Sequence, residues 1–181
     1  SELTLILHQH PEAYRMRCLE AFNDDMPNPL DRVERLAEAY HWNFDRTNPL
    51  EVSMRLEGGW SDVSLSMCWR DDLETLNVAA TFDVKVPGPR RDEMMRLLAM
   101  INEQQMHGHF DLWPSDGTIL FRNNLMLSGG AEANDAQCEA LIRVAVESCE
   151  RYFPAIQFVI WAGRSAAEAL ESSLLETMGE A

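Results

Sequence analysis

The sequence lacks any apolar run long enough to cross a membrane. Its longest nearly apolar stretch runs from Ala155 to Ala162, with Gln157 inside it, whereas a spanning helix needs about 20 residues. The N-terminal end also lacks a basic segment followed by an apolar core and a small-residue cleavage site, so no secretory signal is recognised. These absences predict a cytoplasmic protein that makes no contact with a membrane.

Positive charge is scarce as well. The 181 residues contain one lysine, Lys85, and 15 lysines and arginines in total, against 30 acidic residues, which gives a formal net charge of -15. Proteins that bind nucleic acid neutralise phosphates with clustered basic side chains. We therefore predict that nucleic acid is not a partner, and we interpret the acidic surface as a source of solubility.

Cysteine and histidine are too few and too scattered for a structural metal site. No CxxC pair occurs, and two cysteines fall on the apolar stripe of a predicted helix, which is typical of buried free thiols in a reducing compartment. Histidines occur in two pairs with a spacing of two, and a metal site usually needs three or four ligands. We expect no metal, no cofactor and no disulfide among Cys18, Cys68, Cys138 and Cys149.

Catalytic motifs are absent too. The sequence contains no GxSxG, P-loop, GxGxxG or HExxH pattern. The carboxylates of Asp71, Asp72 and Glu74 are best explained as a solvated turn. The sequence thus predicts no catalytic residues and a protein that is not an enzyme. The alternative, an enzyme or small-ligand binder with an unfamiliar pocket, stays open, and a deep closed pocket with convergent polar groups would favour it.

What is present is a clear pattern of helices and strands. Asn28 and Pro29 form a typical helix start, an N-cap followed by proline, and an apolar face continues to Tyr40. Alternating apolar residues predict strands at 52–56, 63–69 and 76–82. Two glycines, Gly58 and Gly59, are expected to form a two-residue hairpin turn.

The second half continues the pattern. A helix is predicted from about Arg90 to Met106, followed by strands around 110–112 and 119–127. A further helix is capped by Asn134, Pro154 is expected to begin a separate apolar segment, and a capping box at 165–168 begins the last helix. Because strands and helices do not alternate, the expected fold is α+β, a mostly antiparallel sheet with helices packed on one face.

The helix from Arg90 to Met106 is the predicted dimer surface. Its apolar residues spread over roughly 200° of arc, wider than the stripe of about 100° that one packed face requires. Flexible methionine side chains also suit surfaces that accept varied partners. The sequence therefore predicts a homodimer through this helix, with a helix buried on two sides within one chain as the alternative. The residues concerned are Met94, Met95, Leu97 and Met100.

Four further residues are candidates for partner contact. Trp60 and Trp113 stand at the ends of predicted hairpins, where tryptophan is a frequent binding hot spot, whereas Trp69 and Trp161 fit the core. Arg90 and Arg91 belong to the only basic cluster. They could bind an acidic partner segment, although pairing with neighbouring surface acids is the simpler interpretation.

Four stretches of the sequence form a recognisable pattern: residues 82–87 with Arg90 and Arg91, 98–103, 108–113, and the long and unusual stretch 150–165. On these stretches, the chain from about Asn28 to the C-terminus resembles the YbjN-like family of bacterial proteins. Residues 1–27 fall outside the match, so we interpret them as an N-terminal appendage and linker, and residues 28–181 as a YbjN-like domain.

The resemblance carries its own implications. It implies a fold similar to the chaperones of type III secretion, in the order α-β-β-β-α-β-β-α, which dimerise and bind protein segments. It also implies a role in the regulation of sensory transduction, and the family has no catalytic residues to carry over. Fold likeness does not fix function. The resulting hypothesis is a non-catalytic protein-binding regulator or chaperone-like module, acting as a homodimer on an unidentified protein partner.

Overall fold

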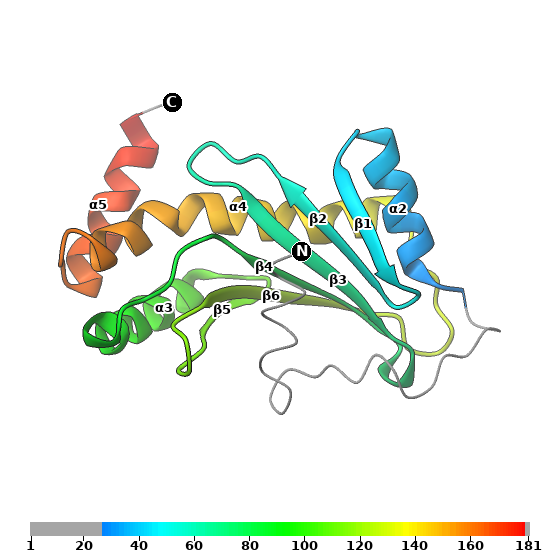
Figure 1. The fold of residues 1–181 in the computed structure, drawn as a ribbon, viewed down its shortest axis with the longest axis horizontal. Coiled ribbons are helices and arrows are strands. Elements are labelled where there is room, and N and C mark those ends of the chain that lie inside the picture. Colours follow the sequence, from blue (N-terminus) through cyan, green and yellow to red (C-terminus); the bar gives the residue numbers. More distant parts are fainter. Residues whose placement is uncertain (1–26, 180–181) are drawn as a thin grey trace.

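The computed structural model describes residues 27–179, and side chains up to residue 173. The predicted appendage therefore lies outside the described residues, except for Pro27. Figure 1 shows the arrangement of the described elements. In chain order they are α2 (Pro29–Ala39), β1 (Asn43–Asn48), β2 (Glu51–Leu56), β3 (Val63–Arg70), the 3-10 turn η1 (Asp71–Leu73), β4 (Thr75–Thr81), the 3-10 turn η2 (Gly88–Arg90), α3 (Arg91–Gln104), β5 (His109–Leu112), β6 (Ile119–Met126), α4 (Asp135–Ile160) and α5 (Ala166–Gly179).

The strands form one six-stranded sheet in the order β1-β2-β3-β4-β6-β5. Every neighbouring pair is antiparallel, and the long helix α4 lies along one face of the sheet (Figure 1). The predicted α+β fold is therefore confirmed.

The core lies between the sheet and the helices. Leu65 and Met67 of β3 stand opposite Ala80 and Val78 of β4, and all four are buried in the same cluster as the apolar residues of the helices. Successive strand residues point to opposite faces. The apolar residues that alternate in the sequence therefore lie on the face of the sheet that the helices cover. A smaller cluster of Ala79, Trp113 and Leu120 stands apart from this core.

The cysteines fall into two kinds. Cys138 and Cys149 are free and buried on α4, as predicted. Burial raises the pKa of the Cys138 thiol to about 11, and burial also raises the pKa of Cys149, so both stay protonated at neutral pH. Cys68, by contrast, is disulfide-bonded, which corrects the expectation that the chain contains no disulfide.

The helix starts follow the caps seen in the sequence. The Oδ1 atom of Asn28 accepts a hydrogen bond from the backbone amide of Leu30 at 3.0 Å. Asn134 and Gln137 form a reciprocal capping box. The Glu168 carboxylate likewise accepts from the amide of Ser165 at 3.1 Å. These short-range contacts satisfy backbone donors that the first helical turn leaves unpaired.

The connection between β2 and β3 differs from the predicted two-residue turn. Leu56 pairs directly with Val63, so the loop between them covers residues 57–62. A carboxylate from α4 holds this loop: Glu150 accepts from the backbone amides of Gly59 at 3.1 Å and Trp60 at 3.3 Å. A partner 90 residues away in the sequence thus replaces the local turn that two glycines would have formed.

Pro154 also behaves differently from the prediction. It lies inside α4, a single helix of 26 residues, and does not begin a new segment. Proline removes one helical hydrogen bond and crowds the preceding turn. Burial of its neighbours Phe153, Ala155 and Ile156 in the core offsets this cost.

Among residues 27–179, no helix combines the length and apolar composition that a membrane span requires.

Candidate interaction surface

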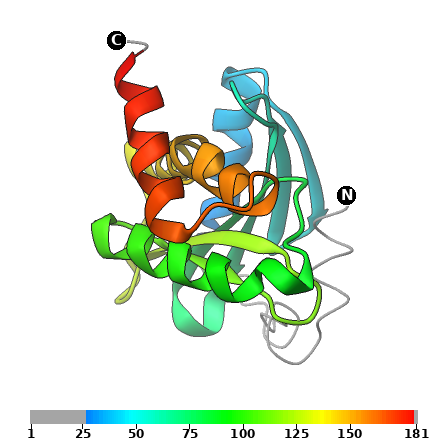
Figure 2. The same cartoon turned by 90° about the vertical axis from the view of Figure 1, so that its left-hand side faces the viewer.

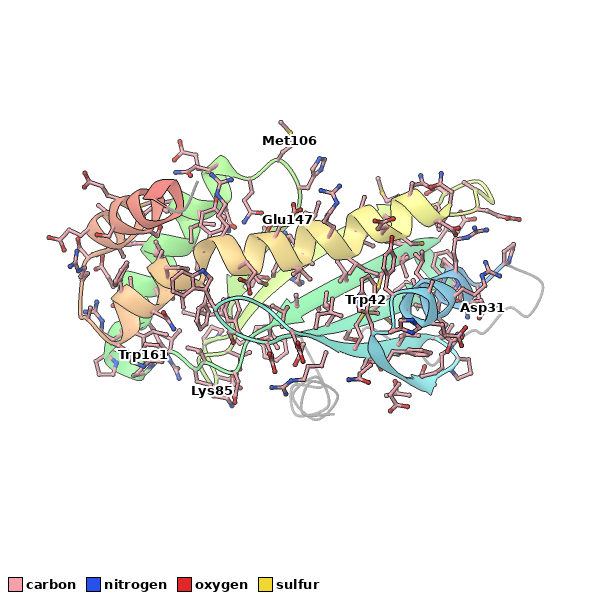
Figure 3. All side chains as sticks on the ribbon, turned by 90° about the horizontal axis from the view of Figure 1, so that it is seen from above. Asp31, Trp42, Lys85, Met106, Glu147 and Trp161 are labelled. Carbon is pink, nitrogen blue, oxygen red and sulfur yellow. The ribbon has the colours of Figure 1, made fainter. Side chains whose placement is uncertain are left out.

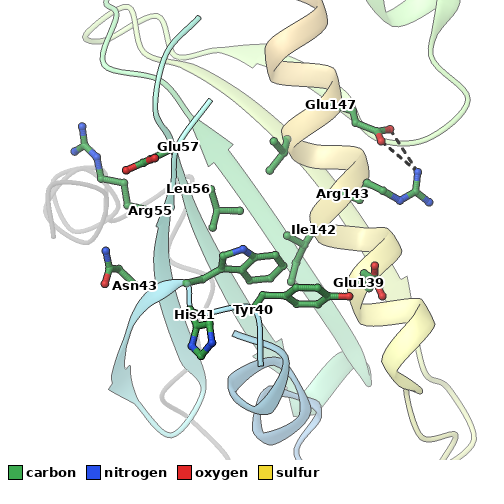
Figure 4. A pocket seen from close by; sticks show the side chains of 12 residues that line it. Tyr40, His41, Asn43, Arg55, Leu56, Glu57, Glu139, Ile142, Arg143 and Glu147 are labelled. Carbon is green, nitrogen blue, oxygen red and sulfur yellow. Dashed lines mark hydrogen bonds and ion pairs between the residues drawn. The ribbon is translucent and has the colours of Figure 1, made fainter. Parts of the chain in front are cut away.

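A hollow of about 550 Å³ opens between the α2–β1 connection, the end of β2 and α4 (Figure 4). Its apolar lining includes Leu56 and Ile142, both buried, together with the aromatic side chains of Tyr40 and Trp42. We call this hollow, defined by those four residues, the aromatic groove. Hollows of this size are common binding sites.

Tyr40 and Trp42 form a stacked pair. Their ring centroids are 4.9 Å apart, with 18° between the ring planes. His41 between them has a φ of 56°, and this left-handed residue turns the chain so that both rings stand on the same side. The negative charge of Glu139 on α4 is the main cause of a raised pKa of Tyr40. A hydrogen bond from the tyrosine hydroxyl to the Glu139 carboxylate raises this pKa further. Tyr40 is nevertheless 49% exposed, whereas Trp42 is partly buried against the core, so the stacked pair presents chiefly the tyrosine ring to solvent.

The two arginines at the rim are each paired with a carboxylate. Arg143 and Glu147 of α4 are 3.4 Å apart, and Arg55 pairs with Asp62 at 3.0 Å. Exposed pairs of this kind contribute about 0–1 kcal/mol and exchange partners easily. In the described part of the chain, no group of three or more potential metal ligands occurs. The groove therefore offers apolar contact framed by weakly held charges, which suits binding.

A second hollow, of about 280 Å³, lies against the other side of α4. Met106, His107, Val144 and Arg151 are among its lining residues, and Glu147 borders both hollows. Figure 3 shows Met106 and Trp42 on opposite sides of α4, with Glu147 between them. Met106 is 88% exposed. The outward side of α4 and its two flanking hollows thus form one surface, which we call the α4 face.

The structure places most of the predicted dimer surface on α3 inside the chain. Met94 and Leu97 are fully buried and Met100 is partly buried in the core. Only Met95 is half exposed. The helix lies against α4, α5 and β5, and Figure 2 shows α3 and α5 side by side. The wide apolar arc of α3 is therefore covered on more than one side within a single chain, as in the alternative that the sequence left open.

The two candidate tryptophans lie in different environments, one exposed and one buried. Trp60, on the loop held by Glu150, is 49% exposed, whereas Trp113 is 7% exposed and packs in the small cluster on Ala79 and Leu120. The core assignment holds for Trp69, which is buried, and fails for Trp161, which is exposed at the end of α4. Trp60 is thus the one of the two hairpin-end candidates that faces solvent.

Arg90 and Arg91 bind backbone carbonyls of their own chain. Arg90 donates to the carbonyl oxygens of Val159 at 2.8 Å and Arg164 at 2.6 Å, at the C-terminal end of α4, where helical carbonyls lack internal partners. Arg91 donates to the carbonyl oxygens of Val86 and Pro114. Both arginines therefore connect segments of their own chain, and neither follows the expected pairing with neighbouring acids.

Sequence reasoning missed the residues of the α4 face. The sequence pattern places Tyr40 on the apolar face of the first predicted helix, and Trp42 is not among the residues predicted to contact a partner. One local signal was available: Glu139, Arg143 and Glu147 recur every four residues with alternating charge, which is typical of a solvent-facing row on a helix.

Comparisons with known proteins agree with this fold. A model of the YbjN family, described as "Putative bacterial sensory transduction regulator", matches residues 29–158. No curated protein sequence shows a significant match. A solved structure described as "Crystal structure of YbjN, a putative transcription regulator from E. coli" has 14% sequence identity, a TM-score of 0.50, and covers 81% of this chain and 93% of that one. At that identity the likeness concerns the fold alone.

Proposed function

We propose that this chain, which belongs to the YbjN family, is a non-catalytic regulator that acts in the cytoplasm by contact with other protein chains. In this proposal residues 28–181 form the working domain, residues 1–27 are an appendage, and the acting unit is a homodimer. The family description, a regulator of sensory transduction, supports the regulatory part of the proposal.

The observation that carries the proposal is the aromatic groove. Tyr40, which is half exposed, stacks on the partly buried Trp42 beside the buried Leu56 and Ile142. Aromatic side chains of this kind are enriched where proteins bind each other, because they bury a large area at a small entropic cost. The groove fits an apolar side chain of a protein segment, flanked by charges that pair with the rim.

Two other functions have less support. The charge of -15 disfavours direct contact with nucleic acid. A small ligand is favoured by the volume of the groove, which lies within the usual range for ligand pockets of about 300–1,000 Å³. However, the arginines on its rim already pair with carboxylates, and within residues 27–173 no convergent set of buried polar groups points into it.

A photoreactive benzoylphenylalanine in place of Tyr40 tests the proposal in living cells. We expect it to cross-link protein, because the ring at position 40 would lie inside the contact. The matched control replaces Leu73, which is 57% exposed in η1, at the opposite end of β3 from the groove. The control should give no protein adduct.

Two results would count against the proposal. One is an equal pattern of adducts at positions 40 and 73, which would mean that the groove is not the contact surface. The other is native mass spectrometry that finds a small molecule bound to the purified protein and lost on Trp42→Ala. That result would move the assignment to the ligand-binding alternative.

A further inference from the structure

A row of four charged side chains runs along the outward side of α4. Glu139, Arg143, Glu147 and Arg151 are spaced by four residues, and they alternate in sign. Glu139 is partly buried, and the other three are exposed. In a chain with a net charge of -15, this row sums to zero. It is therefore a place where a second, equally acidic copy could approach without meeting an excess of negative charge.

The row is also complementary to itself when reversed. We infer that a second copy of this chain packs on the α4 face, with the two α4 helices antiparallel about a two-fold axis level with Ala145. In this arrangement Arg143 faces the partner's Glu147, and Glu139 faces the partner's Arg151. The inference rests on the proposed homodimer and specifies its interface. A two-fold interface requires such self-complementarity, because each contact occurs twice.

Helix geometry allows this arrangement. Residues spaced by four form a ridge that is inclined to the helix axis, and two such ridges align when the helices cross at about 50°. From residue 139 to residue 151 the row is about 18 Å long, at a rise of about 1.5 Å per residue. Charges alone would not hold a dimer, because exposed ion pairs contribute little.

The hollows on either side of the row supply the apolar area. A two-fold axis that is perpendicular to both helices and lies in the interface keeps each flank of α4 on the same side in both copies. The aromatic groove of one chain then lies beside that of its partner, and Met106, which is 88% exposed, approaches the partner's second hollow. Flanking contacts of this kind can raise the buried area toward the roughly 800 Å² per chain of a stable interface.

The pairs within one helix do not compete strongly with this contact. The Arg143–Glu147 pair spans 3.4 Å between exposed side chains, and Arg151 has its guanidinium 5.4 Å from the centroid of the Tyr152 ring. Exposed pairs spaced by four residues on a helix are individually weak. Exchange of these partners for those of a second copy therefore costs little.

Charge reversal tests the interface with purified full-length protein. The variant Arg143→Glu places two acids at the centre of each row, and Glu147→Arg places two arginines there. Each variant alone should weaken the dimer roughly a hundredfold, because like charges then face each other twice across the axis. Light scattering at tens of micromolar should give each variant the mass of one chain, 20.6 kDa, while the unmodified protein has twice that mass.

Mixing the two variants is the decisive step. A chain with two acids opposite a chain with two arginines restores every pair, so the mixture should return to the dimer mass. An effect within one chain cannot produce this rescue. The pair Glu139→Arg and Arg151→Glu repeats the test at the ends of the row. Arg96→Glu makes the same charge change on the exposed side of α3, and that variant should remain a dimer.

The outcomes separate the two proposals. Single variants that remain dimers, or a mixture that remains monomeric, would overturn the α4 interface while the homodimer stands. An unmodified protein that has the mass of one chain at hundreds of micromolar would overturn both the homodimer and the interface. Protein contact at the aromatic groove would then still be decided separately, by the cross-link at position 40.

Discussion

The variant Met94→Asp is expected to abolish cooperative unfolding, whereas Met95→Asp, one residue further along the same helix, should melt like the unmodified protein. Met94 is fully buried and Met95 is half exposed. A carboxylate at position 94 would have to lose its hydration without a partner, at a cost of several kcal/mol. That cost is comparable with the whole stability of a domain, about 5–15 kcal/mol.

A milder pair of substitutions gives a measurable difference even if the aspartate variant does not accumulate. Met94→Ala should lower the free energy of unfolding by about 2–5 kcal/mol, and Met95→Ala should change it by less than about 0.5 kcal/mol. Urea denaturation followed by circular dichroism measures both. Equal effects at the two positions would mean that α3 does not face the core as described.

The turn before β6 should tolerate no side chain at Gly117. This glycine has a φ of 78°, and a Cβ atom there would stand 2.3 Å from the carbonyl oxygen of Val86. The same segment is held by a hydrogen bond from the amide of Val86 to the carbonyl oxygen of Gly117, at 2.8 Å. Because the obstacle is backbone, Gly117→Ala must displace a whole strand connection. We expect a loss of roughly 4 kcal/mol or more in the free energy of unfolding.

Gly163 provides the matched control for that substitution. It has a φ of 65°, but no atom of the described residues lies within 4 Å of the place that a Cβ atom would take. Gly163→Ala therefore carries only the backbone strain of a left-handed residue, about 1–2 kcal/mol. The difference between the two variants isolates the clash with Val86. Similar losses at both positions would show that the close approach at Gly117 does not exist.

Features that depend on near neighbours could be predicted from the sequence. The caps at Asn28 and Asn134 need only a side chain and an amide two or three residues away. The strands β3 and β4 could be recognised because alternation of apolar residues reports directly on which side faces the core. The antiparallel arrangement followed from the absence of alternating strands and helices.

Features that depend on partners distant in the sequence could not be predicted from it. The loop after β2 is shaped by Glu150, about 90 residues away, so Gly58 and Gly59 indicated the wrong turn. The wide apolar arc of α3 indicated that this helix packs on more than one side. The sequence did not reveal that α5 packs against this helix, with the amide of Ala166 bonded to the carboxylate of Glu93 at 2.7 Å. A wide arc thus has two explanations, and only the packing decides between them.

The candidate surface combines segments that are about a hundred residues apart. Tyr40 and Trp42 follow α2, whereas Glu139 and Glu147 belong to α4. Neither segment alone has a recognisable motif, and the left-handed conformation of His41 is not one that its residue type requires. The alternating row on α4 was visible in the sequence, but its position between two hollows was not.

The most direct test of the proposed interaction surface compares two faces of the molecule. A photoreactive benzoylphenylalanine is placed either at Glu147, the residue shared by both hollows, or at Met95, the half-exposed position of α3. If the α4 face is where protein chains meet, position 147 yields cross-linked protein of twice the chain mass and position 95 yields none. Cross-linking at position 95 with none at position 147 would contradict the assignment of the α4 face.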